Sequence, residues 1–167
     1  MFFVGAYDLT IDGKNRLSIP SAVRSSTNCD RDGRAFYVVP GRRRGTLAVY
    51  PDRYFERTRR FVPADEQLSE DGHAWREFEY SQSALVDPDA QGRILIPDRL
   101  LKSAGVSKVV TLIGVQDHLE IWNRTEFEAF EKQQWQGFSE HRSKALGELA
   151  ALKREAGVAS SGSGPDD

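Results

Sequence analysis

A duplicated nine-residue pattern constrains this chain more than any other feature of its sequence. The first copy, DGKNRLSIP, covers residues 12–20, and the second, DAQGRILIP, covers residues 89–97. The copies lie 77 positions apart and share Asp, Arg, Ile and Pro in register. A second pair of blocks, residues 47–55 and 119–127, shares Leu, an aromatic residue and Phe at an offset of 72. Two blocks that recur in the same order predict two halves built on one plan.

Each copy of the pattern begins with the chemistry of a tight turn. Asp12 and Asp89 can accept a hydrogen bond from a backbone N–H two residues later, and Gly13 and Gly92 give the backbone freedom to turn. Asn15 stands where the second copy has Gly92, and Asn is the commonest non-glycine residue at positive φ. The aliphatic residues that follow predict a short strand after each turn.

The prolines that end the two patterns, Pro20 and Pro97, cannot extend a central strand but suit the first position of a helix. Each half is therefore predicted to run strand, turn, strand, short helix and hairpin. One such unit cannot bury both sheet faces, so the two copies are expected to share one barrel-like core. The expected later elements are helices at 21–25 and 98–104 (stopped by Gly105) and strands at 35–39, 46–50, 108–113 and 119–122.

These elements give an expected fold class that is mainly β with short helices, that is, α+β. The end of the chain is rich in Ser and Gly, a composition typical of a disordered tail. The predicted divisions are a first repeat at 5–52, a helical and acidic connector at 53–81, a second repeat at 82–125, a C-terminal helix at 126–155 and a disordered tail at 156–167.

Composition narrows the class of protein. Apolar residues make up 39% and charged residues 29% of the 167 residues, which is typical of a soluble globular protein. No apolar run is long enough for a membrane span, and the N-terminal residues lack the features of a signal peptide. The single cysteine, Cys29, excludes an internal disulfide and a Cys-rich zinc site. A cytoplasmic location is therefore expected.

The residue types that carry enzyme chemistry occur without the spacing that such chemistry needs. His73, His118 and His141 are scattered, so neither a metal site nor a cofactor is expected. Neither a nucleophile elbow nor a phosphate-binding glycine loop occurs. Asp12 and Asp89 could be drawn as an acid–base pair, but each is better explained as the cap of its own turn. The sequence indicates neither an enzyme nor a small-molecule substrate.

Basic residues gather in the first part of the chain. Residues 1–60 carry 12 Lys and Arg against 6 Asp and Glu, whereas residues 61–167 carry 11 against 19. Such a separation suggests one end that faces a polyanion and another that faces solvent or a partner. Arg42, Arg43 and Arg44 are adjacent at a predicted hairpin tip, where crowding them is costly unless they meet negative charge. A solvated loop is the alternative.

The arginines of the repeated pattern allow two interpretations, which can both hold. Each can be a structural partner of the Asp four residues earlier, an exposed ion pair that stabilises little. Each can also help to fix a basic arm against a polyanion. The aromatic residues are attributed to core and subunit packing rather than to base stacking. The candidate DNA-binding residues are Lys14, Asn15, Arg16, Arg42, Arg43, Arg44 and Arg93.

The repeated D-x-x-x-R-aliphatic-x-I-P block, the opening MFFVGAYDLTIDGKNRLSIP and the segment DAQGRILIP…VVTLIGVQDHLEIW together resemble the MraZ family over about residues 1–130. By this resemblance Asp12, Arg16, Asp89 and Arg93 are the family's D-x-x-x-R residues, and Lys14 is the basic residue inside the first motif. The sequence departs from the family where Asn15 replaces a glycine and where Gln91 supplies no basic residue. Residues 74–80, commonly Arg-rich in the family, carry the single arginine Arg76.

The resemblance implies two tandem SpoVT–AbrB-type domains, each a swapped hairpin, which together form a pseudo-symmetric double-split β-barrel. It implies a bacterial transcriptional regulator of the division and cell-wall gene cluster, including its own promoter. Such a protein binds promoter repeats in double-stranded DNA as a ring-like homo-oligomer at the nucleoid. The alternative is an antitoxin-like protein-interaction module of the same fold, and the acidic, aromatic segment Glu126–Trp135 favours it.

Overall fold

The computed structural model describes residues 1–60 and 68–161, with side chains as far as Arg154. The chain divides into two compact units, Met1–Phe127 and Glu128–Asp167, which are taken separately below. The limits of the repeats, connector and C-terminal helix predicted from the sequence stay predictions. Part of the predicted connector (61–67) and part of the predicted tail (162–167) lie outside the described residues.

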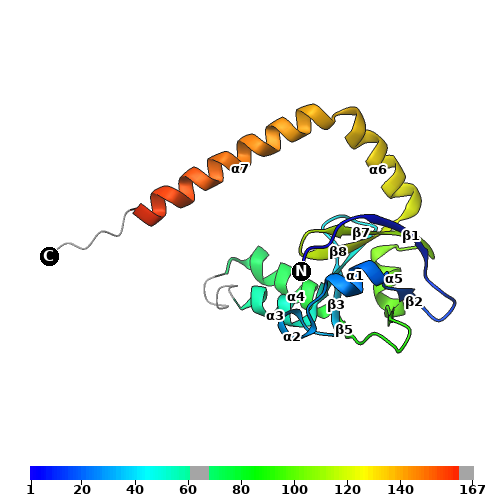
Figure 1. Ribbon diagram of the computed structural model, residues 1–167. Coiled ribbons are helices and arrows are strands. Elements are labelled where there is room, and N and C mark those ends of the chain that lie inside the picture. The colour runs from blue at the N-terminus through cyan, green and yellow to red at the C-terminus, as the bar shows by residue number, and fades with distance from the viewer. Residues whose placement is uncertain (61–67, 162–167) are drawn as a thin grey trace. The chain divides into compact units, whose positions relative to one another are not determined.

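Within the described residues, eight strands form two antiparallel sheets in the first unit (Figure 1). The larger sheet has the order β1-β7-β8-β4-β3-β5, and the smaller one consists of β2 and β6. The strands are β1 (Ala6–Thr10), β2 (Arg16–Ser18), β3 (Phe36–Pro40), β4 (Thr46–Pro51), β5 (Ala84–Val86), β6 (Arg93–Leu95), β7 (Val109–Val115) and β8 (His118–Asn123).

The two repeats exchange strands in the larger sheet. β1, from the first repeat, pairs with β7 of the second, and Thr10 lies opposite Val109. β5, from the second repeat, pairs with β3 of the first, and Phe36 lies opposite Val86. At the centre of the sheet β4 pairs with β8, its counterpart in the other repeat. Neither repeat therefore makes this sheet alone.

The smaller sheet joins the two copies of the repeated pattern directly. Arg16 lies opposite Leu95 and Ser18 opposite Arg93, so equivalent residues occupy equivalent places in the pair. Two further backbone bonds cross between the copies. The Ile19 N–H donates to the Gly92 carbonyl at 3.0 Å, and the Ile96 N–H donates to the Asn15 carbonyl at 2.9 Å.

The α+β class predicted from the sequence is confirmed, but the described residues form no closed barrel. In the larger sheet β1 and β5 each pair on one side only and are its open edges. β2 and β6 have three residues each and pair only with one another in the described part of the chain. Strands this short leave the edges β1 and β5 unjoined, so the architecture is an open sheet beside a small ribbon.

Five helices of the first unit begin at signals visible in the sequence. α1 (Ser21–Ser26), α3 (Asp52–Arg59) and α5 (Asp98–Ala104) each follow a proline that occupies the N-cap. For Pro20 and Pro97 this is one position before the place predicted from the sequence. Asn28 caps α2 (Cys29–Asp32), and Ser69 caps α4 (Glu70–Ser81). Gly105 ends α5 in the left-handed conformation, as predicted.

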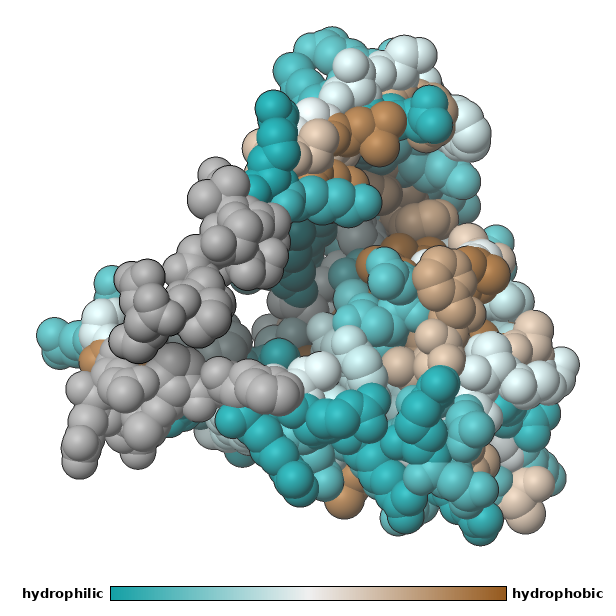
Figure 2. Space-filling model, turned by 60° about the vertical axis from the view of Figure 1, so that its left-hand side comes forward, coloured by the Kyte–Doolittle hydropathy of each residue, from teal (hydrophilic) through white to brown (hydrophobic). Residues whose placement is uncertain are grey.

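Both repeats supply the core of the first unit. The central side chains of the ribbon, Leu17 and Ile94, are fully buried, and so are their neighbours Ile19 and Ile96. Strands of the larger sheet contribute the other large buried side chains, among them Val38, Leu47, Leu112, Leu119 and Ile121. Other apolar residues reach the surface, where Figure 2 shows brown patches among the teal ones, and the exposed ones include Trp75, Phe78, Leu85 and Leu95.

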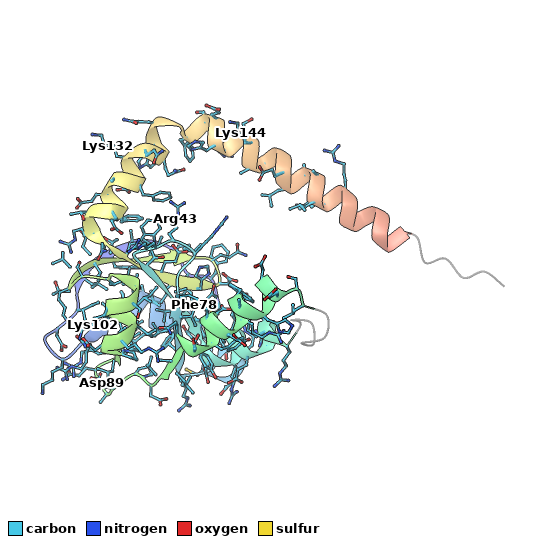
Figure 3. The ribbon with its side chains drawn as sticks, turned by 180° about the vertical axis from the view of Figure 1, so that it is seen from behind. Arg43, Phe78, Asp89, Lys102, Lys132 and Lys144 are labelled. Carbon is cyan, nitrogen blue, oxygen red and sulfur yellow. The ribbon has the colours of Figure 1, made fainter. Side chains whose placement is uncertain are left out.

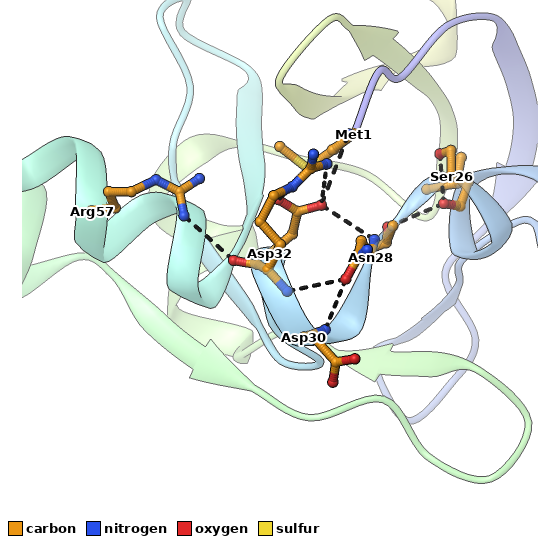
Figure 4. A network of polar contacts seen from close by, with 9 residues as sticks. Met1, Ser26, Asn28, Asp30, Asp32 and Arg57 are labelled. Carbon is orange, nitrogen blue, oxygen red and sulfur yellow. Dashed lines mark hydrogen bonds and ion pairs between the residues drawn. The ribbon is translucent and has the colours of Figure 1, made fainter.

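A polar network holds the residues that precede β1 against α2 (Figure 4). The amino group of Met1 lies 3.9 Å from Oδ2 of Asp32, whose side chain is buried. The Arg31 guanidinium donates two hydrogen bonds to the same carboxylate, at 2.9 and 3.0 Å. The hydrogen bonds from Arg31 lower the pKa of Asp32 against the opposing effect of burial. The negative charge of the buried Asp32 carboxylate is thus balanced by the Met1 amino group and the Arg31 guanidinium.

Two helices follow the sheet. α6 (Arg124–Gln136) begins directly after β8, and α7 (Phe138–Ser161) fills most of the second unit. Gly137 separates them, so the predicted C-terminal helical segment is divided at the glycine that the sequence offers as a break. No helix of the described ranges is long and apolar enough to cross a membrane.

The closest backbone approach in the sheet gives a test of the fold. A Cβ at Gly114 would lie 2.4 Å from the backbone nitrogen of Val4 and 2.6 Å from the carbonyl carbon of Phe3. Since backbone atoms cannot swing aside, we expect Gly114→Ala to lower the free energy of unfolding by about 1–3 kcal/mol. The melting temperature, measured by circular dichroism, should fall by roughly 2–4 °C per kcal/mol.

Gly13→Ala is the matched control, because a Cβ at Gly13 meets nothing within 4 Å. Equal melting temperatures for the two variants would show that β7 and the residues before β1 are not packed in this way.

Candidate nucleic-acid interface

The first turn, residues 12–15, is organised around one carboxylate. Oδ1 of Asp12 accepts hydrogen bonds from the backbone N–H groups of Lys14 and Arg16, both at 2.9 Å. Oδ2 accepts from Nε of Arg16 at 2.8 Å and lies 2.7 Å from its Nη2. Asn15 adopts a φ of 63°, which confirms the conformation predicted for it.

The second turn, residues 89–92, repeats these contacts almost atom for atom. Oδ1 of Asp89 accepts from the backbone N–H groups of Gln91 and Arg93, at 2.9 and 3.0 Å. Oδ2 accepts from Nε of Arg93 at 2.8 Å and from Nη2 at 2.6 Å. Gly92 takes the place of Asn15, with a φ of 75°. The shared Asp and Arg of the repeated pattern therefore encode one turn, made twice.

The same contacts set the electrostatics of both turns. Hydrogen bonds from the Arg16 side chain and backbone lower the pKa of Asp12 from 3.8 to about 2, and those from Arg93 lower the pKa of Asp89 equally. Two of the three guanidinium nitrogens of each arginine contact the carboxylate. The structural role considered for Arg16 and Arg93 is therefore present in this structure.

A basic side chain from outside the motif lies against the first turn. Nζ of Lys108, just before β7, donates to the Asp12 carbonyl at 3.4 Å and also bonds to Oδ1 of Asn15. The Asn15 amide donates to Asp98, which is paired with Lys102. Lys14 itself is exposed. Sequence reasoning missed Lys108 because it lies 93 positions from Asn15 and outside both patterns.

A different arginine lies against the second turn. The Arg24 guanidinium, from α1, is so near Gly92 that a Cβ there would come within 2.8–2.9 Å of it. Gln91, the counterpart of Lys14, is exposed at the tip. Figure 1 shows that the β1–β2 and β5–β6 loops both project on the side of the first unit where β2 lies. The two turns thus share a framework and differ in the side chains they display.

The arginine tip, residues 42–44, is a separate feature. It joins β3 to β4, and Figure 3 shows Arg43 and Asp89 on well-separated parts of the first unit. The Arg43 guanidinium lies over the Trp122 ring, 5.3 Å from its centroid, an arrangement typical of a cation–π contact. All three arginines of the tip are exposed. The contact of Arg43 with Trp122 is one that the sequence alone did not reveal.

Across the described residues no group of three or more His, Cys, Asp and Glu side chains is placed to hold a metal ion. The features that stand out are the paired turns with their basic neighbours and the arginine tip.

The repeat provides an internal control for the turn chemistry. Because the folded-state pKa values of Asp12 and Asp89 lie below their ordinary 3.8, the stability these carboxylates contribute is present above that pH and is lost as the pH falls toward 2. In Arg16→Ala, we expect the Asp12 carboxyl midpoint to move toward 3.8 while that of Asp89 stays about 2. Carboxyl ¹³C titration by NMR measures both; a shared shift would mean that the turns are not held independently by their own arginines.

Known proteins are similar to this chain over most of its length. Residues 80–149 match the profile of a family described as "MraZ protein, putative antitoxin-like". Proteins named "Transcriptional regulator MraZ" from Burkholderia cenocepacia (strain HI2424) and Burkholderia mallei (strain SAVP1) are each 35% identical over 130 residues, which cover 78% of this chain and 88% of each relative. The resemblance inferred from the repeated pattern is thus confirmed, and the chain belongs to the MraZ family.

Proposed function

We propose that this protein is a sequence-specific DNA-binding transcriptional regulator without enzymatic activity. The observation that carries the proposal is the pair of near-identical turns, held on one ribbon, each with a basic side chain from elsewhere in the fold against it. The relatives named transcriptional regulators support it. A protein that reads DNA needs positive charge for affinity and a fixed frame for specificity, and the paired turns offer both.

The charge around the turns is positive. Lys14 and Arg16 belong to the first turn, which Lys108 contacts, and Arg93 belongs to the second, which Arg24 approaches. Against these cations stand the two turn carboxylates and Asp87, which lines one pocket with Arg24, while nearby Asp98 is paired with Lys102. The excess of positive charge suits the phosphate backbone of duplex DNA.

The turns also supply a fixed frame. In each, the Asp carboxylate holds the backbone N–H of the residue two positions later, which is Lys14 in one turn and Gln91 in the other. These two exposed side chains consequently start from equivalent, well-defined backbone positions. A lysine suits a phosphate, and a glutamine suits the hydrogen-bonding edge of adenine. In this proposal Arg16 and Arg93 position the turns and present their remaining N–H groups to DNA.

The family suggests the target and the assembly. We infer that the targets are promoter repeats of the division and cell-wall gene cluster, including the protein's own promoter, and that the protein acts in the cytoplasm at the nucleoid. The exchange of β1 and β5 between repeats supports swapped-hairpin, SpoVT–AbrB-type domains at 5–52 and 82–125. A ring-like homo-oligomer would bind several DNA repeats at once, so that weak single contacts add up through avidity.

The second candidate function is an antitoxin-like protein-interaction module. It is favoured by α6, which has no buried side chain in the structure and exposes Trp135 to 68%. Large exposed apolar side chains mark interaction surfaces.

Fluorescence anisotropy with the duplex upstream of the protein's own gene separates the two candidates, since a module that only masks a protein binds this duplex no better than a scrambled one.

Asp12→Asn tests whether Arg16 acts through the turn. The substitution removes a negative charge, so charge alone predicts tighter DNA binding. If the carboxylate is needed to orient Arg16, the ratio of specific to non-specific affinity should instead fall about tenfold or more, since one well-placed bidentate contact discriminates by ~1–3 kcal/mol. Arg16→Ala should act in the same direction with a nearly native melting temperature.

Asp98→Asn is the matched control, because it removes the same charge near the same turn without touching the Asp12–Arg16 contact. Tighter or unchanged binding is expected for this control. If Asp12→Asn also bound DNA more tightly, Asp12 would not be needed to orient Arg16, and this part of the proposal would be wrong.

The arginine tip should contribute affinity rather than specificity, because Arg42 and Arg44 are exposed on a loop that begins and ends with glycine. We expect Arg42→Ala/Arg44→Ala to weaken binding to the cognate and the scrambled duplex alike. The log–log salt dependence should flatten by ~0.9 for each phosphate that the variant no longer neutralises. Lys144→Ala/Arg154→Ala removes the same charge from α7 and should leave the slope unchanged; an unchanged slope for the tip variant would identify the tip as a solvated loop.

A further inference from the structure

The long helix α7 exposes apolar side chains along its length. It has 24 residues and so is about 36 Å long, and none of its described side chains is buried. Phe138, Leu149 and Leu152 are 50%, 54% and 59% exposed, and Leu146, at the edge of the same face, is 53% exposed. Figure 3 shows side chains, that of Lys144 among them, standing away from this helix. Leucines exposed in this number need a partner surface.

The spacing of these residues is that of a coiled coil. Five residues at alternating steps of four and three lie on one stripe of the helix. They are Phe138, Arg142, Ala145, Leu149 and Leu152. The sequence continues the same spacing with alanines at positions 156 and 159. Arg142 interrupts the stripe, and a single polar residue in such a seam sets register at some cost in stability.

Charged residues flank the stripe with opposite signs. Glu148 precedes Leu149 on one side, and Lys153 follows Leu152 on the other. In two parallel helices, residues with this five-residue separation face each other across the seam, so Glu148 of each copy meets Lys153 of the other. In an antiparallel pair each flank of the stripe faces the same flank of the other helix, so Glu148 does not meet Lys153. The charges therefore select a parallel pair.

We propose that α7 pairs in parallel with α7 of a second copy of this chain, as a short two-stranded coiled coil. The family match ends at residue 149, so the stripe runs past the part of the chain that the family shares. A coiled coil this short is weak by itself, and the proposal rests on the homo-oligomer proposed above, which raises the local concentration of α7. Copies related by rotation around a ring also direct their C-termini the same way.

Disulfide trapping tests the pairing in the full chain. In a Cys29→Ser background, Ala145→Cys and Leu152→Cys should each form a covalent dimer under a mild oxidant, because a parallel pair places every stripe residue beside its own equivalent. Ser143→Cys lies on the far side of the helix and should not crosslink. Non-reducing gels measure the dimer, and light scattering of the same samples reports the oligomer.

Charge reversal tests the orientation. In the Leu152→Cys chain, Glu148→Lys should lower the crosslinked fraction by about three- to fivefold, since two like-charge contacts replace two favourable ones. Adding Lys153→Glu should restore it, because the opposite charges then face each other again.

The outcomes separate this proposal from the proposed function. Crosslinking of only one of the two stripe positions, or equal crosslinking of Ser143→Cys, would overturn the parallel pair. An oligomer in light scattering without any stripe crosslink would overturn the pairing and leave the homo-oligomer standing. Specific crosslinks in a protein that does not bind its upstream duplex would support the pairing and contradict the DNA-binding function.

Discussion

The carboxylate of the Asp that begins each turn organises the rest of the architecture. One carboxylate gathers two backbone N–H groups and a guanidinium, which closes the chain on itself within five residues. This closure aims the next residues inward, where Leu17 and Ile94 meet at the centre of the ribbon. Because the Asn15 and Gly92 carbonyls accept bonds from the opposite copy, each turn is also held by the other repeat. The ribbon thus needs two copies of the pattern.

The contact of each turn arginine with this carboxylate changes what the arginine can do. An arginine that already shares two nitrogens with a carboxylate is more rigid than a free one, and loses less entropy when it binds a ligand. Its contribution to DNA binding then depends on the carboxylate as much as on its own charge. The freely displayed side chains are those two positions after each Asp, and they differ: Lys14 in one turn and Gln91 in the other. The two turn backbones are alike, but the side chains at their tips differ. Such an arrangement suits a DNA site whose two halves have different sequences.

Local chemistry was predictable from the sequence, whereas contacts across the chain were not. The turns, the positive φ of Asn15, the helices after Pro20 and Pro97 and the stop at Gly105 all follow from residues within a few positions. The strand order and the open sheet depend on pairings between residues some 50 to 100 positions apart, for which the repeat gives symmetry but no register. The contacts of Lys108 and Arg24 with the turns, and of Arg43 with Trp122, are long-range in the same way. They depend on how the folded chain packs, and local sequence motifs do not specify that packing.

The uneven distribution of charge acquires a physical meaning in this architecture. The positive first part of the chain supplies Lys14, Arg16, Arg24 and the arginine tip. α7 instead carries both signs, arranged on the two sides of an apolar stripe. A surface of one sign attracts a polyanion, while a stripe with matched flanks selects a copy of itself and discourages other alignments. DNA contact and self-association would therefore use different surfaces, and a change in one need not disturb the other.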